Sequence, residues 1–233
     1  MKNIFKKNKK LILKWESEVN YDKAITPVKT SIPKWYKDIP KFRNDNFKDL
    51  TIKYCIPFLD SLTTGYTINL PNDLLVEHDK GLPKLSWPPN MSKVKGIIQR
   101  EELADENLIP YFHFPYEFAW DLRVSFTLPK GYSAIITHPL NRNDLPFTTI
   151  TGIIDSGIVM SPHGNLPFYL KKNFTGIIPQ GTPVAQIIPF LRENWDSEKT
   201  KGLVEIGKHH NDSSAMVFSG WYKKTFWSKK EYN

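Results

Sequence analysis

Cysteine is nearly absent from this sequence: Cys55 is the one cysteine among 233 residues. A single thiol cannot form an intrachain disulfide, so a disulfide-stapled domain is excluded and a reducing, intracellular compartment is indicated. No apolar run approaches the roughly 18 residues of a membrane-spanning helix. The short apolar patch Leu11–Leu13 has charges too close to it for a signal peptide. We therefore expect a protein that is not secreted and has no membrane span.

The common signatures of enzymes and metal sites are also lacking. The sequence contains no phosphate-binding loop, no dinucleotide fingerprint and no nucleophile elbow. Cys55 has no second cysteine or histidine at the spacing of a zinc site. Among the histidines, His113, His138 and His163 could form a metal site if the fold brought them together. Scattered histidines are usually surface or structural residues, so the sequence predicts no metal.

Positive charge is concentrated near the N-terminus. The formal net charge is +8, and residues 1–48 hold 13 Lys and Arg against 5 Asp and Glu, whereas the remaining residues hold 19 of each. Such a basic arm could bind nucleic acid, an acidic protein surface or an anionic membrane, or it could be a solvated tail. Its first 25 residues have an imperfect helical pattern of apolar side chains, which predicts a short helix there.

From about residue 49 to residue 195 the pattern is that of a mostly β domain. Short apolar runs alternate with turn signals such as Pro129-Lys130-Gly131 and Pro179-Gln180-Gly181. This spacing is typical of a sandwich, jelly roll or small barrel with few short helices. The expected strands are Thr51–Phe58, Gly65–Leu70, Asp73–Val76, Val94–Gln99, Leu122–Leu128, Tyr132–Thr137, Thr148–Ile154, Phe174–Ile178 and Val184–Phe190.

Aromatic residues mark both arms that flank this domain. Trp35 and Tyr36 lie between two prolines in the N-terminal arm, a context that favours extended or turn structure over a long helix. Trp221 and Trp227 alternate with lysine pairs in the C-terminal extension, residues 196–233, where a helix is expected at Ser197–Gly202. The four aromatics are candidate partner-binding anchors. The alternative for Trp35 is that it packs the arm onto its own domain.

Four pieces of the β domain, in order, resemble the motifs of the trimeric dUTPase family. They are Thr64–Ile68 with Pro71–Val76, then Leu128–Ile136, Thr151–Ser156 and Ile178–Ile188, and together they cover about half of the chain. The resemblance implies a dUTPase-like distorted β-barrel or jelly roll with N- and C-terminal arms. It also implies a homo-oligomer, with a trimer as the natural assembly.

The same resemblance assigns roles to individual residues. Asp155 matches the family's carboxylate that orients the attacking water and contacts the sugar, so Asp155 is the candidate catalytic residue. Gly181 and Gln186 match positions near the phosphates. Gly65, before its strand, permits a tight turn or a close backbone approach. Together with Asn141, which lies in the second motif, these residues form the candidate ligand-binding set.

Several departures from the motifs argue against dUTP hydrolysis. Thr67 stands where the first motif carries the aspartate that supports magnesium binding, and Leu140-Asn141 stands where the second carries its phosphate-binding Arg-Ser pair. Gly157-Ile158 replaces the family's Asp-Tyr pair, and the final Gly-rich, Arg-containing motif is missing. A triphosphate needs cations and a metal to offset its charge. We therefore predict no cofactor, with magnesium required only if the chain hydrolyses nucleotides.

The whole chain also resembles a family without known activity that is encoded by tailed phages of marine bacteria. The pieces that carry this likeness are Ile32–Tyr36, Pro57–Asp60, His138–Arg142 and Gly181–Pro183. The first hypothesis is a non-enzymatic viral protein, in a host cytoplasm or a virion, whose scaffold binds a virion component, a host factor or itself. The second is a nucleotide binder or nucleotidohydrolase that uses Asp155. The third is nucleic-acid binding through the basic arm.

Overall fold

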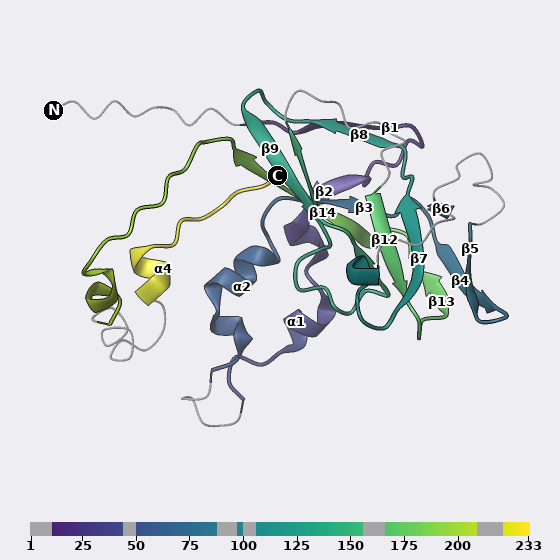
Figure 1. Ribbon diagram of the computed structural model, residues 1–233, viewed down its shortest axis with the longest axis horizontal. Coiled ribbons are helices and arrows are strands. Elements are labelled where there is room, and N and C mark those ends of the chain that lie inside the picture. Colours follow the sequence, from purple (N-terminus) through teal and green to yellow (C-terminus); the bar gives the residue numbers. More distant parts are fainter. Residues whose placement is uncertain (1–10, 44–49, 88–96, 100–105, 156–165, 209–220) are drawn as a thin grey trace.

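The computed structural model describes residues 11–43, 50–87, 97–99, 106–155, 166–208 and 221–233. Across these ranges the chain is mostly β, with four antiparallel sheets and a few short helices (Figure 1). The mostly β fold expected from the alternating apolar pattern is therefore confirmed. No helix in these ranges is long and apolar enough to cross a membrane.

A five-stranded sheet contains one strand from each of the four motif-like pieces. Its strand order is β11 (Gly152–Asp155), β9 (Tyr132–Thr137), β14 (Pro183–Leu191), β3 (Tyr66–Asn69) and β2 (Ile25–Pro27). The central strand β14 pairs with β3 on one side and β9 on the other. Residues far apart in sequence are thereby brought onto one surface.

Three smaller sheets complete the fold. A four-stranded sheet has the order β10 (Phe147–Thr149), β12 (Leu166–Lys171), β7 (His113–Trp120) and β6 (Ile97–Gln99). A three-stranded sheet has the order β13 (Gly176–Ile178), β4 (Leu74–Asp79) and β5 (Leu82–Ser86). The fourth sheet pairs β1 (Lys14–Ser17) with β8 (Val124–Thr127).

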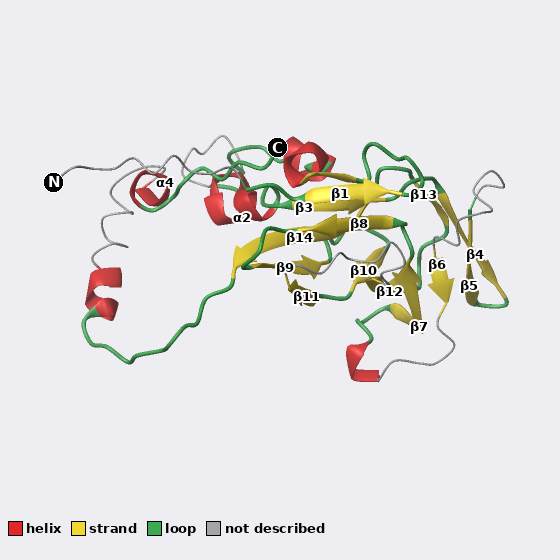
Figure 2. Cartoon of the chain, turned by 90° about the horizontal axis from the view of Figure 1, so that it is seen from above, coloured by secondary structure: helices red, strands yellow, loops and turns green. Residues whose placement is uncertain are grey.

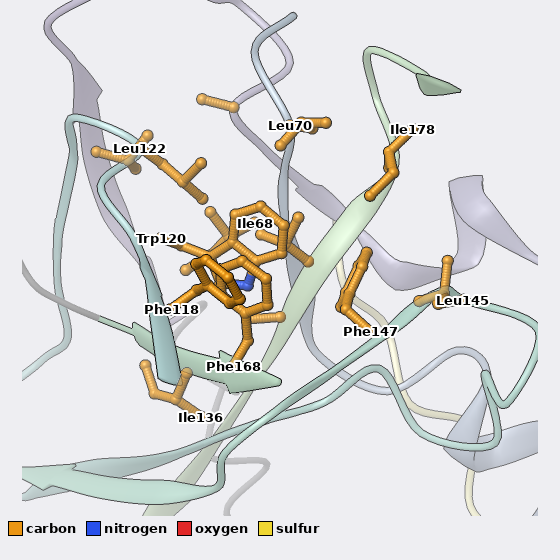
Figure 3. Close-up of a cluster of buried hydrophobic side chains, with 14 of the residues drawn as sticks. Ile68, Leu70, Phe118, Trp120, Leu122, Ile136, Leu145, Phe147, Phe168 and Ile178 are labelled. Carbon is orange, nitrogen blue, oxygen red and sulfur yellow. The ribbon is translucent and has the colours of Figure 1, made fainter. Parts of the chain in front are cut away.

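The core lies where the four- and five-stranded sheets face each other. The rings of Trp120 and Phe168 stack with centroids 3.8 Å apart and planes 11° apart, and Phe147 contacts Trp120 edge-on at 5.0 Å. Ile68 and Ile136 pack against this aromatic group from the five-stranded sheet (Figure 3). The single polar atom of the Trp120 ring is satisfied, because Nε1 donates to Thr149 Oγ1 at 3.2 Å. The largest fully buried side chains are thus aromatic.

The helices are short, and two of them replace an expected strand. The prediction of a strand at Thr51–Phe58 is wrong: this segment forms a 3₁₀ turn, η2 (Ile52–Tyr54), and the start of α2 (Ile56–Ser61). The Thr51 hydroxyl accepts from the N–H of Lys53, and Pro57 lies in the first helical turn, where its missing N–H costs nothing. The other short helices are η1 (Val28–Ser31), α1 (Lys34–Asp38), η4 (Glu106–Leu108), residues 203–208 and α4 (Trp221–Thr225).

Two further expectations about local structure are corrected. The helix predicted for the first 25 residues is wrong over its described part, since Lys14–Ser17 is a strand that pairs Trp15 with Phe126. Residues 192–200 have no regular secondary structure, and the helix expected at Ser197–Gly202 begins only at residue 203. Gly202 has φ +89°, a conformation that does not continue a helix, so it separates the two segments.

Both arms contact the β domain. The N-terminal arm contributes β1 and β2 to two sheets, and α1 lies beside α2 (Figure 1). After β14 the chain runs outward as an extended segment and then returns through α4, so that the C-terminus lies close to β3 (Figures 1 and 2). The expected strand Thr148–Ile154 is also divided, because β10 and β11 belong to different sheets.

Candidate functional site

Asp155 lies at the end of edge strand β11 and faces solvent. Its Oδ1 accepts a hydrogen bond from Ser133 Oγ at 2.8 Å, and the guanidinium of Arg192 lies 3.8 Å from the same oxygen. The Asp155 side chain is 59% exposed. Strand pairing explains the contact with Ser133, since these two residues are opposite each other in the β9–β11 ladder. The candidate catalytic carboxylate is therefore accessible, with one hydroxyl and one cation beside it.

Gln186 is buried and its side-chain amide is fully used inside the chain. Its Oε1 accepts from the N–H of Leu140 at 2.8 Å, and its Nε2 donates to the carbonyls of Thr64 at 2.8 Å and Ser61 at 3.2 Å. The residue is 1% exposed. One side chain on β14 thus ties the end of α2, the turn before β3 and the loop after β9 together. These contacts satisfy backbone groups that burial would otherwise leave unpaired.

The remaining ligand-binding candidates also make structural contacts. Asn141, at φ +58°, donates from Nδ2 to Ser61 Oγ at 2.6 Å. Gly65, at φ +81°, comes so close to β14 that an added Cβ would lie 2.1 Å from the Ile187 carbonyl oxygen. Gly181 is exposed, also at φ +81°, in the turn before β14. Asn141, Gly65 and Gln186 meet around Ser61 and Thr64, whereas Gly181 and Asp155 lie elsewhere.

The first-motif position occupied by Thr67 is buried against the N-terminal arm. Its hydroxyl lies 3.1 Å from the hydroxyl of Thr26 on β2, and the two strands pair at this point. Asn69 extends the same contact by donating to Thr26 Oγ1 at 2.9 Å. Thr67 stands where the motif of the dUTPase family carries a carboxylate. In this chain its side chain contacts the N-terminal arm and helps to fix β2 against β3.

The histidines named as possible metal ligands have separate structural partners. His113 Nδ1 donates to the Tyr111 carbonyl at 2.9 Å, and His138 Nε2 donates to the Arg142 carbonyl at 3.1 Å. Burial lowers the pKa of both residues below the ordinary 6.5, and the nearby Lys171 ammonium acts in the same direction. His163 lies outside the described residues. Within the described ranges no group of three metal-ligating side chains occurs.

Trp35 and Tyr36 contact their own domain. Trp35 Nε1 donates to Asp144 Oδ1 at 3.1 Å, and its ring meets Phe58 at 6.3 Å. Tyr36 is buried and stacks on Phe58 with ring centroids 5.7 Å apart. This pair therefore holds α1 against α2, which agrees with the packing alternative for Trp35.

The C-terminal segment also binds back to the domain, through a residue that sequence reasoning missed. Asp60 on α2 accepts from Trp227 Nε1 at 3.0 Å with each carboxylate oxygen, and Lys230 Nζ lies 2.5 Å from its Oδ2. Tyr232 meets the Tyr66 ring edge-on at 5.6 Å. Trp221 begins α4, and its side chain is outside the described part of the chain.

Three cavities border described parts of the chain. One, of about 670 Å³, is bordered by the N-terminal segment, the C-terminal segment and residues Tyr66, Tyr132 and Pro189. Two smaller cavities, of about 340 and 190 Å³, adjoin β5 and β1. Among the described residues, none of these three cavities is lined by Asp155, Gln186 or the other candidate ligand-binding residues.

Comparison with known proteins gives no family assignment. No protein-family model matches the chain, and no curated protein matches it. Solved dUTPase structures do match. A mutant dUTPase from phage phi11 of S. aureus is 16% identical, with 47% of this chain and 80% of that chain covered and a TM-score of 0.27.

Two further dUTPase structures cover more of the chain. Native EIAV dUTPase is 14% identical, with 81% of this chain and 100% of that chain covered and a TM-score of 0.31. A mutant dUTPase of Staphylococcus bacteriophage 80alpha is 11% identical, with coverages of 82% and 97% and a TM-score of 0.32. The chain thus has a distant likeness to phage and retroviral dUTPase structures, at identities and TM-scores too low to say anything about its chemistry.

Proposed function

We propose that the chain is a non-enzymatic viral protein that uses its β scaffold for self-assembly and protein binding. The observation that supports the proposal is that the side-chain amide of Gln186 is engaged in hydrogen bonds within its own chain. The amide that the motif resemblance places near a phosphate is 1% exposed and already bonded to three backbone groups of its own chain. A ligand would have to break these contacts before it could use that side chain.

The surroundings of Gln186 support the same proposal. Asn141 provides one hydrogen bond to Ser61, and Thr67 replaces a carboxylate with a hydroxyl that faces Thr26. A bound triphosphate requires several cationic or amide donors and a metal. The residues at these positions provide contacts within the fold, and the viral origin rests on the sequence likeness to phage proteins.

One observation favours a second candidate function, nucleotide binding. Asp155 is exposed, and Arg192 places a cation 3.8 Å from it. A carboxylate beside a guanidinium could contact a sugar hydroxyl and a phosphate, so a nucleotide-binding role would use this pair. The third candidate, nucleic-acid binding through residues 1–48, rests on the +8 charge of that arm and predicts binding that weakens steeply with salt.

Two measurements on the full-length protein test the proposal. Sedimentation velocity over a concentration series should show a species larger than the monomer, with a trimer expected from the motif resemblance. A thermal-shift screen against nucleotides, with and without magnesium, should show no stabilisation. A ligand present at 100 times its Kd would stabilise by about 2.7 kcal/mol, which such a screen detects readily.

The outcomes separate the candidates. A monomer at every concentration would contradict self-assembly. A shift with a deoxynucleotide that disappears in Asp155→Asn would favour the nucleotide-binding role instead. Salt-sensitive DNA binding that is lost when residues 1–48 are deleted would favour the third candidate.

A further inference from the structure

Segments from the two ends of the chain meet around α2. Tyr36 of α1 stacks on Phe58 of α2, and Trp227, which follows α4, donates to Asp60 near the end of α2. Helices α1 and α4 lie on either side of α2, at the end of the molecule remote from the β4–β5 hairpin (Figure 1). The fold thus brings residues of both arms together at one place on the surface.

These segments hold most of the excess positive charge of the chain. Residues 28–43, 50–61 and 221–233 contain ten Lys and Arg against three Asp and Glu, whereas the rest of the chain contains 22 against 21. Two of the three carboxylates are already engaged, because Asp60 binds Trp227 and Asp38 pairs with Lys34. Positive charge concentrated at one end of a molecule attracts a polyanion.

Lysines lie on both sides of α2. Lys37 on α1 is exposed, and Lys53 Nζ donates to its carbonyl at 2.8 Å, so these two residues are neighbours. On α4, Lys223 and Lys224 are exposed, and no carboxylate of the described residues pairs with either. Lys223 Nζ lies 5.6 Å from the centroid of the Trp227 ring. A ligand must carry several negative charges to engage both pairs of lysines.

Two exposed aromatic rings accompany the lysines of α4. Tyr222 is 43% exposed and Phe226 is 59% exposed, and their ring centroids lie 6.3 Å apart. The Phe226 N–H donates to the Tyr222 carbonyl at 3.0 Å, so the two residues are one helical turn apart. Aromatic rings beside cationic side chains are the combination by which proteins bind single-stranded nucleic acid, with bases stacked on the rings.

We propose that this end of the molecule binds single-stranded nucleic acid. The lysines contact phosphates on both sides of α2, and the two rings of the C-terminal segment stack on bases. We call the site the basic–aromatic surface, and its residues are Lys37, Lys53, Lys223, Lys224, Tyr222 and Phe226. The inference goes beyond self-assembly, and it differs from binding by residues 1–48 alone because it needs the C-terminal residues.

The exposed rings favour a single strand over the other polyanions. In a duplex the faces of the bases are stacked on one another, so Tyr222 and Phe226 would find no base to stack on. An acidic protein surface would engage the lysines, but its carboxylates offer nothing that favours a flat ring. Unpaired bases joined by phosphates provide partners for both kinds of side chain.

A charge-reversal pair tests the lysines. Binding of the full-length protein to a labelled oligothymidylate is measured by fluorescence anisotropy over a series of salt concentrations. Lys223→Glu combined with Lys224→Glu should weaken binding at least about tenfold at low salt and reduce the slope of log Kd against log salt by about 1–2. Lys80→Glu combined with Lys84→Glu makes the same charge change on the exposed, remote β4–β5 hairpin and should alter Kd less than about twofold.

A second pair of substitutions tests the rings. Tyr222→Leu combined with Phe226→Leu keeps apolar side chains but removes the flat rings, so binding should weaken at least about fivefold with an unchanged salt slope. Because both side chains are exposed, the melting temperature should stay close to that of the wild type. Unlabelled polyglutamate, which has charge but no bases, should compete far less well than unlabelled oligothymidylate.

The outcomes decide the inference. The absence of oligothymidylate binding at low salt, or equal weakening by the two charge-reversal pairs, would overturn it. If the leucine substitutions leave Kd unchanged and polyglutamate competes as well as oligothymidylate, the surface binds acidic proteins and the inference fails. Sedimentation velocity is read separately: a monomer that binds oligothymidylate as expected would refute the proposed self-assembly and leave this inference standing.

Discussion

The Oε1 atom of Gln186 accepts a hydrogen bond from the N–H of Leu140 at 2.8 Å, although the two residues are 46 positions apart. The same amide reaches Ser61 and Thr64, more than 120 positions earlier in the chain. This side chain therefore crosslinks the loops around three elements of the fold. Its environment is that of a structural residue, so we expect its substitution to lower the free energy of unfolding.

We expect Gln186→Leu to lower the free energy of unfolding by about 2–4 kcal/mol, because it leaves the Leu140 N–H and two carbonyls without partners in a buried site. Urea unfolding followed by tryptophan fluorescence measures the change. Gln180→Leu is the matched control: Gln180 is exposed and its Nε2 makes one bond, to the Pro71 carbonyl, so the loss should stay below about 1 kcal/mol. Equal stability of Gln186→Leu and the wild type would contradict the structural role.

Gly65 and Gly131 provide a second matched pair. Both have positive φ, but a Cβ at Gly65 would lie 2.1 Å from the Ile187 carbonyl oxygen, whereas a Cβ at Gly131 would meet nothing within 4 Å. We predict that Gly65→Ala destabilises the fold by about 3 kcal/mol and Gly131→Ala by about 1–2 kcal/mol, the cost of the backbone conformation alone. Chemical denaturation of both variants tests the difference, and equal effects would show that close approach at Gly65 is unimportant.

Three of the strands that sequence reasoning missed contain a proline. Tyr132–Thr137 was predicted with its observed bounds, because its apolar run is uninterrupted and follows a Pro-Lys-Gly turn. β7, β12 and β5 contain Pro115, Pro167 and Pro83, and a proline in an apolar run argues against a strand. In these strands the burial of neighbouring aromatic residues such as Trp120 outweighs the unfavourable effect of the proline.

The sequence motifs named candidate residues but did not predict the contacts that these residues make. Sequence motifs indicated Asp155 and Gln186: Gln186 lies on the expected strand Val184–Phe190, and Asp155, expected just after the strand Thr148–Ile154, is the last residue of β11. The partners of Gln186 come from loops distant in sequence, and no local pattern encodes such contacts. Asp60 was missed for the same reason, since its partners Trp227 and Lys230 lie about 170 positions later.

Asp60 should control attachment of the C-terminal segment. It binds the Trp227 indole with both oxygens and pairs with Lys230, and its side chain is only 18% exposed. We expect Asp60→Leu to release residues 226–233 and to increase their cleavage rate in limited proteolysis several-fold, because a detached segment samples cleavable conformations. Asp38→Leu, which removes an exposed pair with Lys34, should leave cleavage unchanged. Unaltered proteolysis of Asp60→Leu would contradict this attachment.

The buried histidines predict how stability depends on pH. Burial lowers the pKa of His113 and His138 below the ordinary 6.5, so between the folded pKa and 6.5 the unfolded chain binds more protons. The free energy of unfolding should therefore fall as the pH drops below about 6.5. Urea unfolding between pH 8 and pH 5 measures this slope, and His113→Gln combined with His138→Gln should flatten it. A double variant with the wild-type slope would assign the effect to other groups.

Loss of the Asp155 carboxylate should have little effect on the stability of the fold. Its carboxylate is 59% exposed and holds one hydrogen bond and one loose ion pair, so Asp155→Asn should change the free energy of unfolding by less than about 1 kcal/mol. In the proposed scaffold role, self-association measured by sedimentation should also be unchanged. Ser133→Ala is the complementary variant, since it removes the buried hydroxyl that donates to Asp155. If the Asp155→Asn variant stays folded but loses its biological function, the carboxylate takes part in that function. The nucleotide-binding candidate then replaces the scaffold proposal.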